Sequence, residues 1–171
     1  MRLAPCWNGS RATGPKARCI EVTDCWQLWF DGAAAPNPGP MGLGGLLLSP
    51  AGERLELSRR AGASGCNNEA ELLALGQALD MAYAAGARRL TIRGDSDFAV
   101  QHLQGGAHTA VPRLVALLQR LSVSLGRFEG GVEFFWVPRH RNGEADRLSR
   151  LALGLNTAPP APKARRRRGR R

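Results

Sequence analysis

Apolar residues recur along this chain in patterns that divide it into short strands and longer helices. The segment 25–30 (CWQLWF) is apolar at odd and even positions alike, as expected for a central strand buried on both faces. The segment 67–86 is rich in Ala and Leu, begins with Asn at the N-cap and closes at Gly86, which predicts a helix. The whole pattern predicts strands at 25–30, 43–49, 53–58, 88–94 and 131–137, and helices at 67–86, 95–105, 112–128 and 142–154.

The order of these elements predicts an α/β fold. Three successive strands, the second and third joined by the short link 50–52, are followed by strands that alternate with helices. This order favours a mixed sheet covered by helices. In such sheets, functional side chains gather at the carboxyl ends of the strands.

Positive charge is concentrated at the two ends of the chain. The 24 Lys and Arg residues exceed the 14 Asp and Glu residues, and seven of the 24 lie in 158–171 and four in 1–19. We therefore divide the chain into a basic N-terminal arm (1–24), a nearly neutral domain (25–156) and a Pro- and Arg-rich tail (157–171). Such arms favour binding to nucleic-acid phosphates, although a basic tail can also serve only solubility or general contact with anionic surfaces.

The sequence shows no sign of a membrane or export segment. No apolar run reaches the ~18–20 residues that a bilayer-spanning helix needs, and the first residues lack the apolar core of a signal peptide. We therefore expect a soluble protein, cytoplasmic or associated with the nucleoid, that acts as a monomer.

Two acidic residues stand where predicted strands end. Asp31 directly follows the first strand, and Asp95 follows the fourth. Either acid alone could be a helix cap or a turn residue. Two of them, on strands that can lie side by side, favour a shared site.

Glu71 lies on the apolar face of the first predicted helix, which continues through Leu75, Ala78 and Leu79. An unpaired carboxylate on that face is costly, so we interpret Glu71 as a functional residue. Glu69 lies on a more polar face, and we expect it to be solvated.

Asp146 lies near the start of the last predicted helix, where a carboxylate can simply offset the helix dipole. If several carboxylates converge, however, they repel one another unless divalent cations with oxygen ligands bind between them. Two such ions about 4 Å apart form a clamp for phosphodiester displacement. Carboxylate ligands favour magnesium or manganese over zinc.

Four sequence blocks, taken in order, resemble those of the type 1 ribonuclease H family. They are DGAAAPNPGPMGLGG from Asp31, NNEAELLAL from Asn67, RGDSDFAVQHL from Arg93 and WVPRHRNGEADRLSRLA from Trp136. Each block is modest alone, but four in this order and spacing are highly specific. The resemblance implies a ribonuclease H-like fold, a five-stranded mixed sheet with its second strand antiparallel and helices on both faces.

The resemblance also implies a chemistry for the acidic residues. Asp31, Glu71, Asp95 and Asp146 are expected to hold two Mg²⁺ ions, or Mn²⁺, one generating the attacking hydroxide and the other stabilising the leaving oxygen. The implied activity is endonucleolytic hydrolysis of the RNA strand of RNA/DNA hybrids, giving 3′-hydroxyl and 5′-phosphate ends. The counterpart of Glu71 also contacts a ribose 2′-hydroxyl, the group that distinguishes RNA from DNA.

Four further residues match family positions that contact substrate. Asn37, Asn67 and Asn68 match asparagines that reach the minor groove of the hybrid, where an amide can both donate and accept. His140 lies in the loop where some members carry a histidine that assists proton transfer or product release. The loop to Asp146 is shorter here, and the alternative role for His140 is contact with phosphate.

Two features that some members use to hold the hybrid are missing from the sequence. There is no dense Lys/Arg protrusion after Gln104 and no separate hybrid-binding domain at the N-terminus. We therefore expect the basic tail, together with the N-terminal arm, to supply affinity. The alternatives are a resolvase or exonuclease on the same fold, a nucleic-acid-binding module without turnover, and a basic structural protein.

Overall fold

The computed structural model describes residues 24–155 and confirms the α/β fold. Its elements are β1 (Cys25–Ala34), β2 (Gly39–Leu48), β3 (Arg54–Gly65), α1 (Asn67–Ala84), β4 (Arg89–Gly94), α2 (Asp97–Leu103), α3 (Pro112–Leu125), β5 (Val132–Trp136), the short 3₁₀ turn η2 (Arg139–Arg141) and α4 (Gly143–Ala152). The basic arm and tail lie outside the described residues, apart from position 24, so the predicted domain boundaries stay predictions. Among the helices of this described part, none has the length and apolar character needed to cross a membrane.

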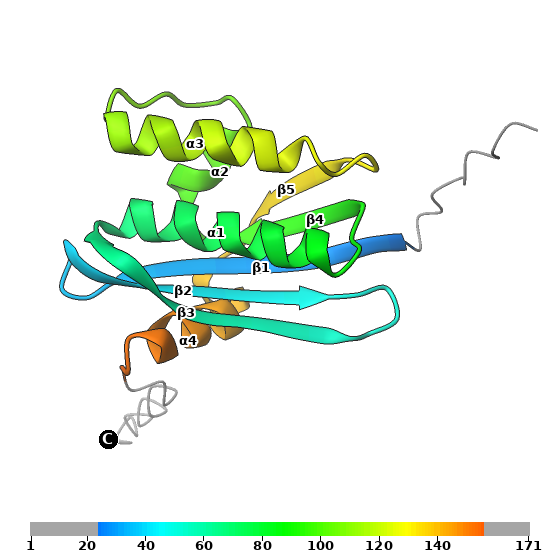
Figure 1. Cartoon of the computed structure of the whole chain (residues 1–171), viewed down its shortest axis with the longest axis horizontal. Helices are drawn as coiled ribbons and strands as arrows, with labels where there is room; N and C mark the ends of the chain where they lie inside the picture. The colour runs from blue at the N-terminus through cyan, green and yellow to red at the C-terminus, as the bar shows by residue number, and fades with distance from the viewer. Residues whose placement is uncertain (1–23, 156–171) are drawn as a thin grey trace, which may run out of the picture.

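The five strands form one mixed sheet in the order β3-β2-β1-β4-β5. β2 is antiparallel to both β1 and β3, whereas β4 runs parallel to β1 and β5 runs parallel to β4. Helices α1 and α3 lie on one side of the sheet and α4 lies on the other (Figure 1). The predicted architecture, including the antiparallel second strand, is therefore confirmed.

The main core lies between β1, β4 and α1. Leu28 and Phe30 of β1 and Ile92 of β4 are almost fully buried against Leu75 and Leu79 of α1. This is the apolar helix face that the sequence predicted. Each such side chain contributes about 1.5–3 kcal/mol on burial, so the core fixes α1 firmly over the two central strands.

Three strands extend further than the sequence pattern predicted. β1 continues past Asp31 to Ala34, because its backbone pairs with β2 as far as Met41. Asp31 therefore lies within a strand and not at its end. β2 begins four residues earlier than predicted, at Gly39, and β3 continues to Gly65. Backbone pairing satisfies the peptide groups of these Gly-containing segments, which the hydrophobic pattern left outside the predicted strands.

Two glycines, one on β1 and one on β2, allow helices to approach the sheet close to Asp31. A Cβ atom at Gly32 of β1 would overlap the backbone of Ala70 in α1. A Cβ atom at Gly44 of β2 would overlap the backbone of Ala145 in α4. Both helices therefore reach the sheet at backbone contact, one on each face.

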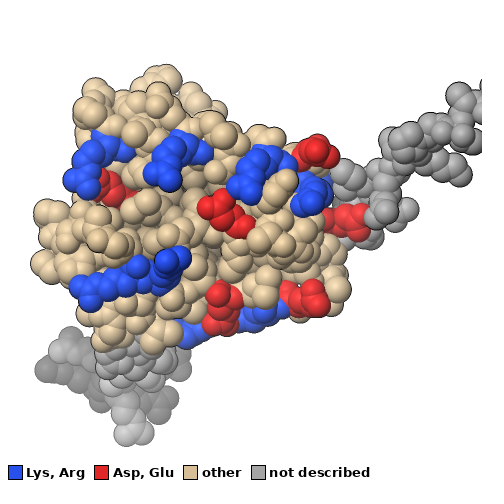
Figure 2. Space-filling model, viewed as in Figure 1, with Lys and Arg blue, Asp and Glu red and all other residues tan. Residues whose placement is uncertain are grey.

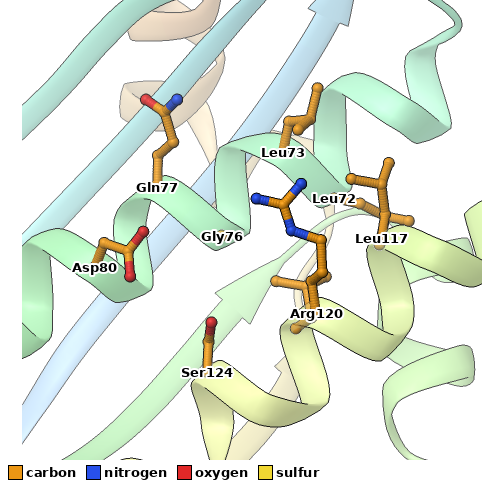
Figure 3. Close-up of a pocket in the computed structure, with 9 residues that line it drawn as sticks. Leu72, Leu73, Gly76, Gln77, Asp80, Leu117, Arg120 and Ser124 are labelled. Carbon is orange, nitrogen blue, oxygen red and sulfur yellow. The ribbon is translucent and has the colours of Figure 1, made fainter.

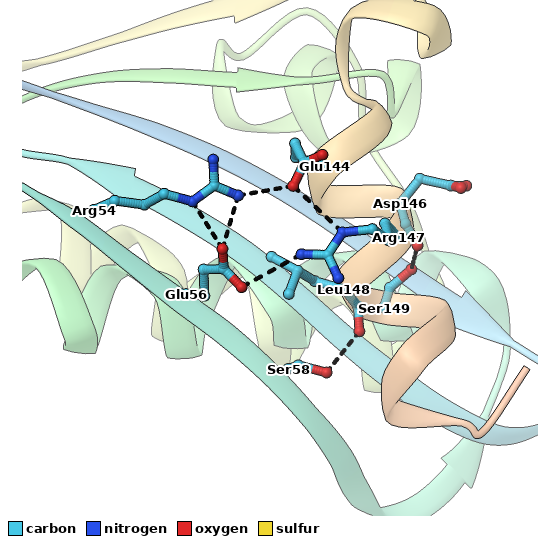
Figure 4. Close-up of polar contacts among 8 residues, drawn as sticks. All are labelled: Arg54, Glu56, Ser58, Glu144, Asp146, Arg147, Leu148 and Ser149. Atoms are coloured by element: carbon cyan, nitrogen blue, oxygen red, sulfur yellow. Dashed lines mark hydrogen bonds and ion pairs between the residues drawn. The ribbon is translucent and has the colours of Figure 1, made fainter. Parts of the chain in front are cut away.

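Helix α4 is tied to the edge strand β3 by a network of four charged side chains (Figure 4). Arg54 lies 2.7 Å from both Glu56 and Glu144. Arg147 contacts the same two acids at 3.4 and 3.3 Å. These side chains are 35–51% exposed, so each pair contributes at most about 1 kcal/mol. Together they set the position of α4 along β3.

Candidate active site

The four predicted carboxylates line one cavity of about 260 Å³ at the edge of the sheet. Asp31 comes from β1, Asp95 directly follows β4, Glu71 comes from the first turns of α1, and Asp146 comes from the first turn of α4. Strands β1 and β4 are parallel neighbours, which brings Asp31 and Asp95 to the same end of the sheet. The two helices bring the other acids to it from opposite faces.

Each of the four carboxylates accepts a hydrogen bond from one neighbouring side chain. The pairs are Ser149 to Asp31, Ser96 to Glu71, Asn142 to Asp95 (2.5 Å) and Arg139 to Asp146 (2.5 Å). In every pair, the two residues come from different segments of the chain. These donors hold the carboxylates in fixed orientations toward the cavity.

Sequence reasoning did not identify these donors as site residues, although two carried a local signal. Ser96 directly follows Asp95, and Ser149 lies three residues after Asp146, on the same face of α4. The Ser149 hydroxyl oxygen also lies 2.9 Å from the backbone carbonyl oxygen of Asp146, which is the alternative acceptor for its single proton.

Asn142 anchors the turn that leads into α4. Its side chain is 1% exposed and donates through Nδ2 to the Phe30 carbonyl at 2.9 Å as well as to Asp95. Its Oδ1 atom is buried and has no hydrogen-bond partner among the described residues. One amide thus links β1, the end of β4 and the start of α4.

Burial and mutual repulsion raise the pKa values of two acids in the cavity. Burial is the largest cause for Asp31, and the charges of Asp95 and Asp146 add to it, so its pKa rises to about 6. Burial also raises the pKa of Glu71 to about 7, with further contributions from Asp31 and Asp95. The hydrogen bonds from the two serines oppose these shifts only in part.

Arg139 brings positive charge to the rim of the cavity. It forms the ion pair with Asp146, and this contact raises the pKa of the guanidinium further. Its side chain is 73% exposed, so it approaches the carboxylates from the solvent side. Sequence analysis singled out the next residue, His140, and did not assign a role to Arg139.

The prediction that Glu69 is solvated is wrong. Glu69 is 7% exposed, accepts a hydrogen bond from the Cys66 backbone N–H at 2.8 Å and forms a 2.8 Å ion pair with Arg113 of α3. Cys66, not Asn67, is the N-cap of α1. The side chain of Glu69 folds back onto the start of its own helix and meets an arginine from a distant segment, which a helical-face pattern does not reveal.

Of the three predicted substrate asparagines, Asn67 lies at the cavity. Asn67 lines it and accepts a hydrogen bond from the Ala34 N–H at 2.8 Å. Its backbone N–H donates to Oδ1 of Asn37 at 3.2 Å, which ties the β1–β2 connection to the start of α1. Asn37 is exposed, and Asn68 is half-buried in the first turn of α1.

His140 does not lie at the carboxylate cavity. It is exposed in η2 and lines a different cavity of about 420 Å³, together with Trp29, Leu46 and Arg141. A third hollow of about 180 Å³, between α1 and α3 beside Gly76, contains none of the predicted site residues (Figure 3). A catalytic role for His140 stays a prediction.

The donor set fits a hard divalent cation. Four carboxylates face one cavity, oxygen is the ligand that magnesium and manganese prefer, and repulsion among the acids is the condition that a cation relieves. Within residues 24–155, no three His, Cys, Asp or Glu side chains already stand close enough together to hold a metal ion. A carboxylate held through one oxygen can still offer the other to an ion.

Comparison with known proteins matches one family to the segment of the chain that carries all four carboxylates. Residues 29–152 match the family described as reverse transcriptase-like. The chain is 32% identical over 124 residues to the bifunctional protein Rv2228c of Mycobacterium tuberculosis, but these residues span only 34% of that protein. It is 34% identical over 143 residues to ribonuclease H of Roseobacter denitrificans, which covers 73% of this chain and 93% of that enzyme.

Solved structures show the same fold. Ribonuclease H1 from the halophilic archaeon Halobacterium salinarum superposes with a TM-score of 0.72 at 34% identity, covering 76% of this chain and 98% of that one. LC11 ribonuclease H1, solved in complex with an RNA/DNA hybrid, superposes with a TM-score of 0.69 at 28% identity, covering 75% and 96%.

Proposed function

Because this chain belongs to the ribonuclease H family, we propose that it is an endoribonuclease that hydrolyses the RNA strand of RNA/DNA hybrids. Cleavage leaves 3′-hydroxyl and 5′-phosphate ends. The observation that carries the proposal is the convergence of Asp31, Glu71, Asp95 and Asp146 on one cavity. A family fold alone would not support an activity, whereas four acids in one cavity supply the chemistry.

Asp31, Glu71, Asp95 and Asp146 would hold two Mg²⁺ or Mn²⁺ ions. When bound, such a pair activates the attacking water and neutralises charge on the leaving 3′ oxygen. The raised pKa values of Asp31 and Glu71 support this assignment, because they arise from burial of the two acids and, to a smaller degree, from repulsion by the other acids of the cavity. Ser149, which holds Asp31, keeps that carboxylate in place before an ion arrives.

The hybrid would lie over the cavity, with Asn37, Asn67 and Asn68 in its minor groove. Asn67 lines the cavity and is tied to the β1–β2 connection, so the loop and the helix would contact substrate as one unit. A related ribonuclease H1 has been solved with an RNA/DNA hybrid, which supports this substrate class. Arg139 at the rim would offset part of the charge that the substrate phosphates bring.

The proposal is tested by offering the protein several nucleic acids in magnesium or manganese. The panel contains an end-labelled RNA/DNA hybrid, single-stranded RNA, duplex RNA, duplex DNA and branched DNA. We expect cutting of the hybrid only, in its RNA strand. Asp95→Asn should remove the activity, whereas the matched variant Asp97→Asn, two residues away and exposed in the first turn of α2, should keep it.

The same panel separates the alternatives. Tight binding of the hybrid without cutting would favour a binding module of this fold. Cutting of branched DNA, or shortening of DNA from its ends, would favour a resolvase or an exonuclease. Equal activity in Asp95→Asn and Asp97→Asn would contradict the carboxylate site itself.

A further inference from the structure

A row of large side chains crosses three neighbouring strands on the sheet face that carries α4. Trp29 of β1 is in register with Arg93 of β4, and Arg93 is in register with Phe135 of β5. Side chains in register on paired strands point to the same face, so the three lie next to one another. Asp31 follows Trp29 by two residues and points to the same face, about 7 Å further along the strand.

The row is a stacked and partly exposed surface. The Arg93 guanidinium lies 5.1 Å from the centre of the Trp29 ring and 5.9 Å from that of Phe135. Arg93 also donates to Gln27 at 3.1 Å, which holds it between the two rings. Phe135 is 48% exposed although it sits on a β-strand of the sheet. Phe135 and the arginine beside it thus form a partly exposed patch of aromatic and cationic groups on the edge strand β5.

A second cavity, separate from the one that the carboxylates line, opens next to this row. Trp29 lines it together with Leu46 of β2, and His140 and Arg141 of η2 form its border. Its volume of about 420 Å³ leaves room for a planar ring system. The lining thus combines apolar side chains with the basic His140 and Arg141 and one acid, Glu144.

The charges around the row favour an anionic occupant. Arg93 and Arg141 bring positive charge to this face. Glu133, two residues before Phe135, and Glu144, which lines the cavity, are each ion-paired with arginine. Asp31 and Asp95 lie two residues beyond Trp29 and Arg93, at the carboxylate cavity where divalent cations would bind. A surface of aromatic rings and stacked guanidinium groups, next to basic side chains, is the combination that binds unpaired nucleotides through their bases and phosphates.

We propose that Trp29, Arg93 and Phe135 form a stacking surface for single-stranded nucleic acid that continues from a hybrid bound at the carboxylates. The inference rests on the proposed function, since it places the substrate at the adjacent cavity. Unpaired bases stack on the exposed Phe135 ring, Arg93 supports that ring and supplies positive charge, and Arg141 contacts the backbone. A duplex cannot offer its base faces in this way, so the surface acts on tails and not on the paired region.

The test measures how much a single-stranded tail strengthens binding. Fluorescence anisotropy in EDTA compares a blunt hybrid with hybrids that carry a tail of about ten nucleotides at each end in turn. The full chain is used as wild type, Phe135→Ser and Arg93→Gln. Leu55→Ser is the matched control, because Leu55 is an apolar side chain of similar exposure, 40%, on the opposite edge strand.

We expect at least one tail to tighten binding by the wild type, and Phe135→Ser to weaken binding of that tailed hybrid by about 5- to 100-fold. Arg93→Gln should act in the same direction. All variants should bind the blunt hybrid alike, and Leu55→Ser should retain the full effect of the tail. Circular dichroism verifies that each variant is folded. If Phe135→Ser does not fold, the effect of the tail on binding by Arg93→Gln tests the proposal.

Three results would overturn the inference. The first is a wild type that gains nothing from any tail, and the second is a gain that both folded variants retain. The third is self-association of the wild type that Phe135→Ser abolishes in sedimentation, since this would make the surface an interface between copies. Failure of the proposed function looks different: the wild type would then not cut the blunt hybrid in magnesium, while the effect of the tail could still be measured.

Discussion

At the scale of single residues, the carboxylates and their hydrogen-bond donors form one unit. Asp31 and Asp95 come from neighbouring strands, but the groups that hold them, Ser149 and Asn142, come from α4 and the turn before it. The donors therefore couple the position of the last helix to the orientation of acids on the sheet. Loss of a donor should affect chemistry more than folding.

Ser149→Ala tests this coupling. The substitution removes the hydroxyl that holds Asp31, so we expect kcat for hybrid cleavage to fall about 10- to 100-fold with a weaker apparent affinity for magnesium. Steady-state kinetics across a magnesium titration measure both. The matched control is Ser58→Ala, which removes a 2.8 Å hydrogen bond to the Leu148 carbonyl on the same helix without touching a carboxylate. Equal kcat in the two variants would contradict the positioning role of Ser149.

The raised pKa values of Asp31 and Glu71 predict a stability change with pH when no divalent cation is present. Their folded-state values of about 6 and 7 lie above the ordinary values of 3.8 and 4.5, so the folded protein favours the protonated forms. This contribution is fully present below about pH 4 and is lost as the pH rises through 6 to 7. In EDTA, the free energy of unfolding should therefore fall more steeply with rising pH in the wild type than in Glu71→Gln.

Urea denaturation at about pH 5 and pH 8 measures this difference, which we expect to be about 1–3 kcal/mol. Added magnesium should restore stability to the wild type at the higher pH, because a bound cation relieves the repulsion. Asp97→Asn, which alters an exposed acid, serves as the control and should follow the wild type. If the unfolding free energies of the wild type and Glu71→Gln changed with pH in parallel, the raised pKa of Glu71 would be contradicted.

The structure brings the four predicted acids to one cavity, but residue patterns did not reveal their hydrogen-bond partners. Glu71 was found because a carboxylate on an apolar helix face needs an explanation, and the structure places it at the cavity. Glu69 was misread because its partner, Arg113, lies on a helix far along the chain. Contacts that depend on tertiary approach leave no periodic signal in the sequence.

At the scale of elements, two helices define the cavity by their close approach to the sheet. Gly32 admits α1 and Gly44 admits α4, each at backbone contact. The sequence predicted both helices and all five strands, and it placed Gly44 within the predicted strand 43–49 but Gly32 outside any strand. Only the paired strands show that these glycines face helices.

Gly44→Ala should displace α4 from β2. The added methyl group would overlap the backbone of Ala145, so we expect a loss of about 1–3 kcal/mol in unfolding free energy and a marked fall in kcat, as Asp146 and Ser149 move with the helix. Thermal denaturation and cleavage rates measure the two effects. Gly62→Ala on β3 is the control, because a Cβ atom there meets nothing within 4 Å. Similar behaviour of the two variants would contradict the close-packing explanation.

At the scale of the whole molecule, a nearly neutral domain carries strongly basic ends. The described domain brings four carboxylates to one cavity, and its segment between α2 and α3 carries no Lys or Arg. Acidic and basic side chains are interspersed on the face of this domain shown in Figure 2. Seven of the Lys and Arg residues lie in 158–171. Composition alone revealed this division, whereas the path of the basic ends lies outside the described residues.

Deleting 158–171 should weaken substrate binding without slowing the chemical step. We expect KM for the hybrid to rise and its dependence on salt to flatten, because fewer counterions are released on binding, while kcat stays the same. Kinetics at several salt concentrations measure both quantities. An unchanged salt dependence would show that the tail does not contact the substrate.

The most direct test of the proposed activity follows both strands of one hybrid at once. The RNA and DNA strands carry different labels, and the wild-type protein is added in magnesium and, separately, in EDTA. We predict that the RNA strand is shortened internally in magnesium only, with 3′-hydroxyl and 5′-phosphate ends, and that the DNA strand stays intact. Loss of the DNA label, or equal cutting of the RNA strand in EDTA, would contradict the proposed function.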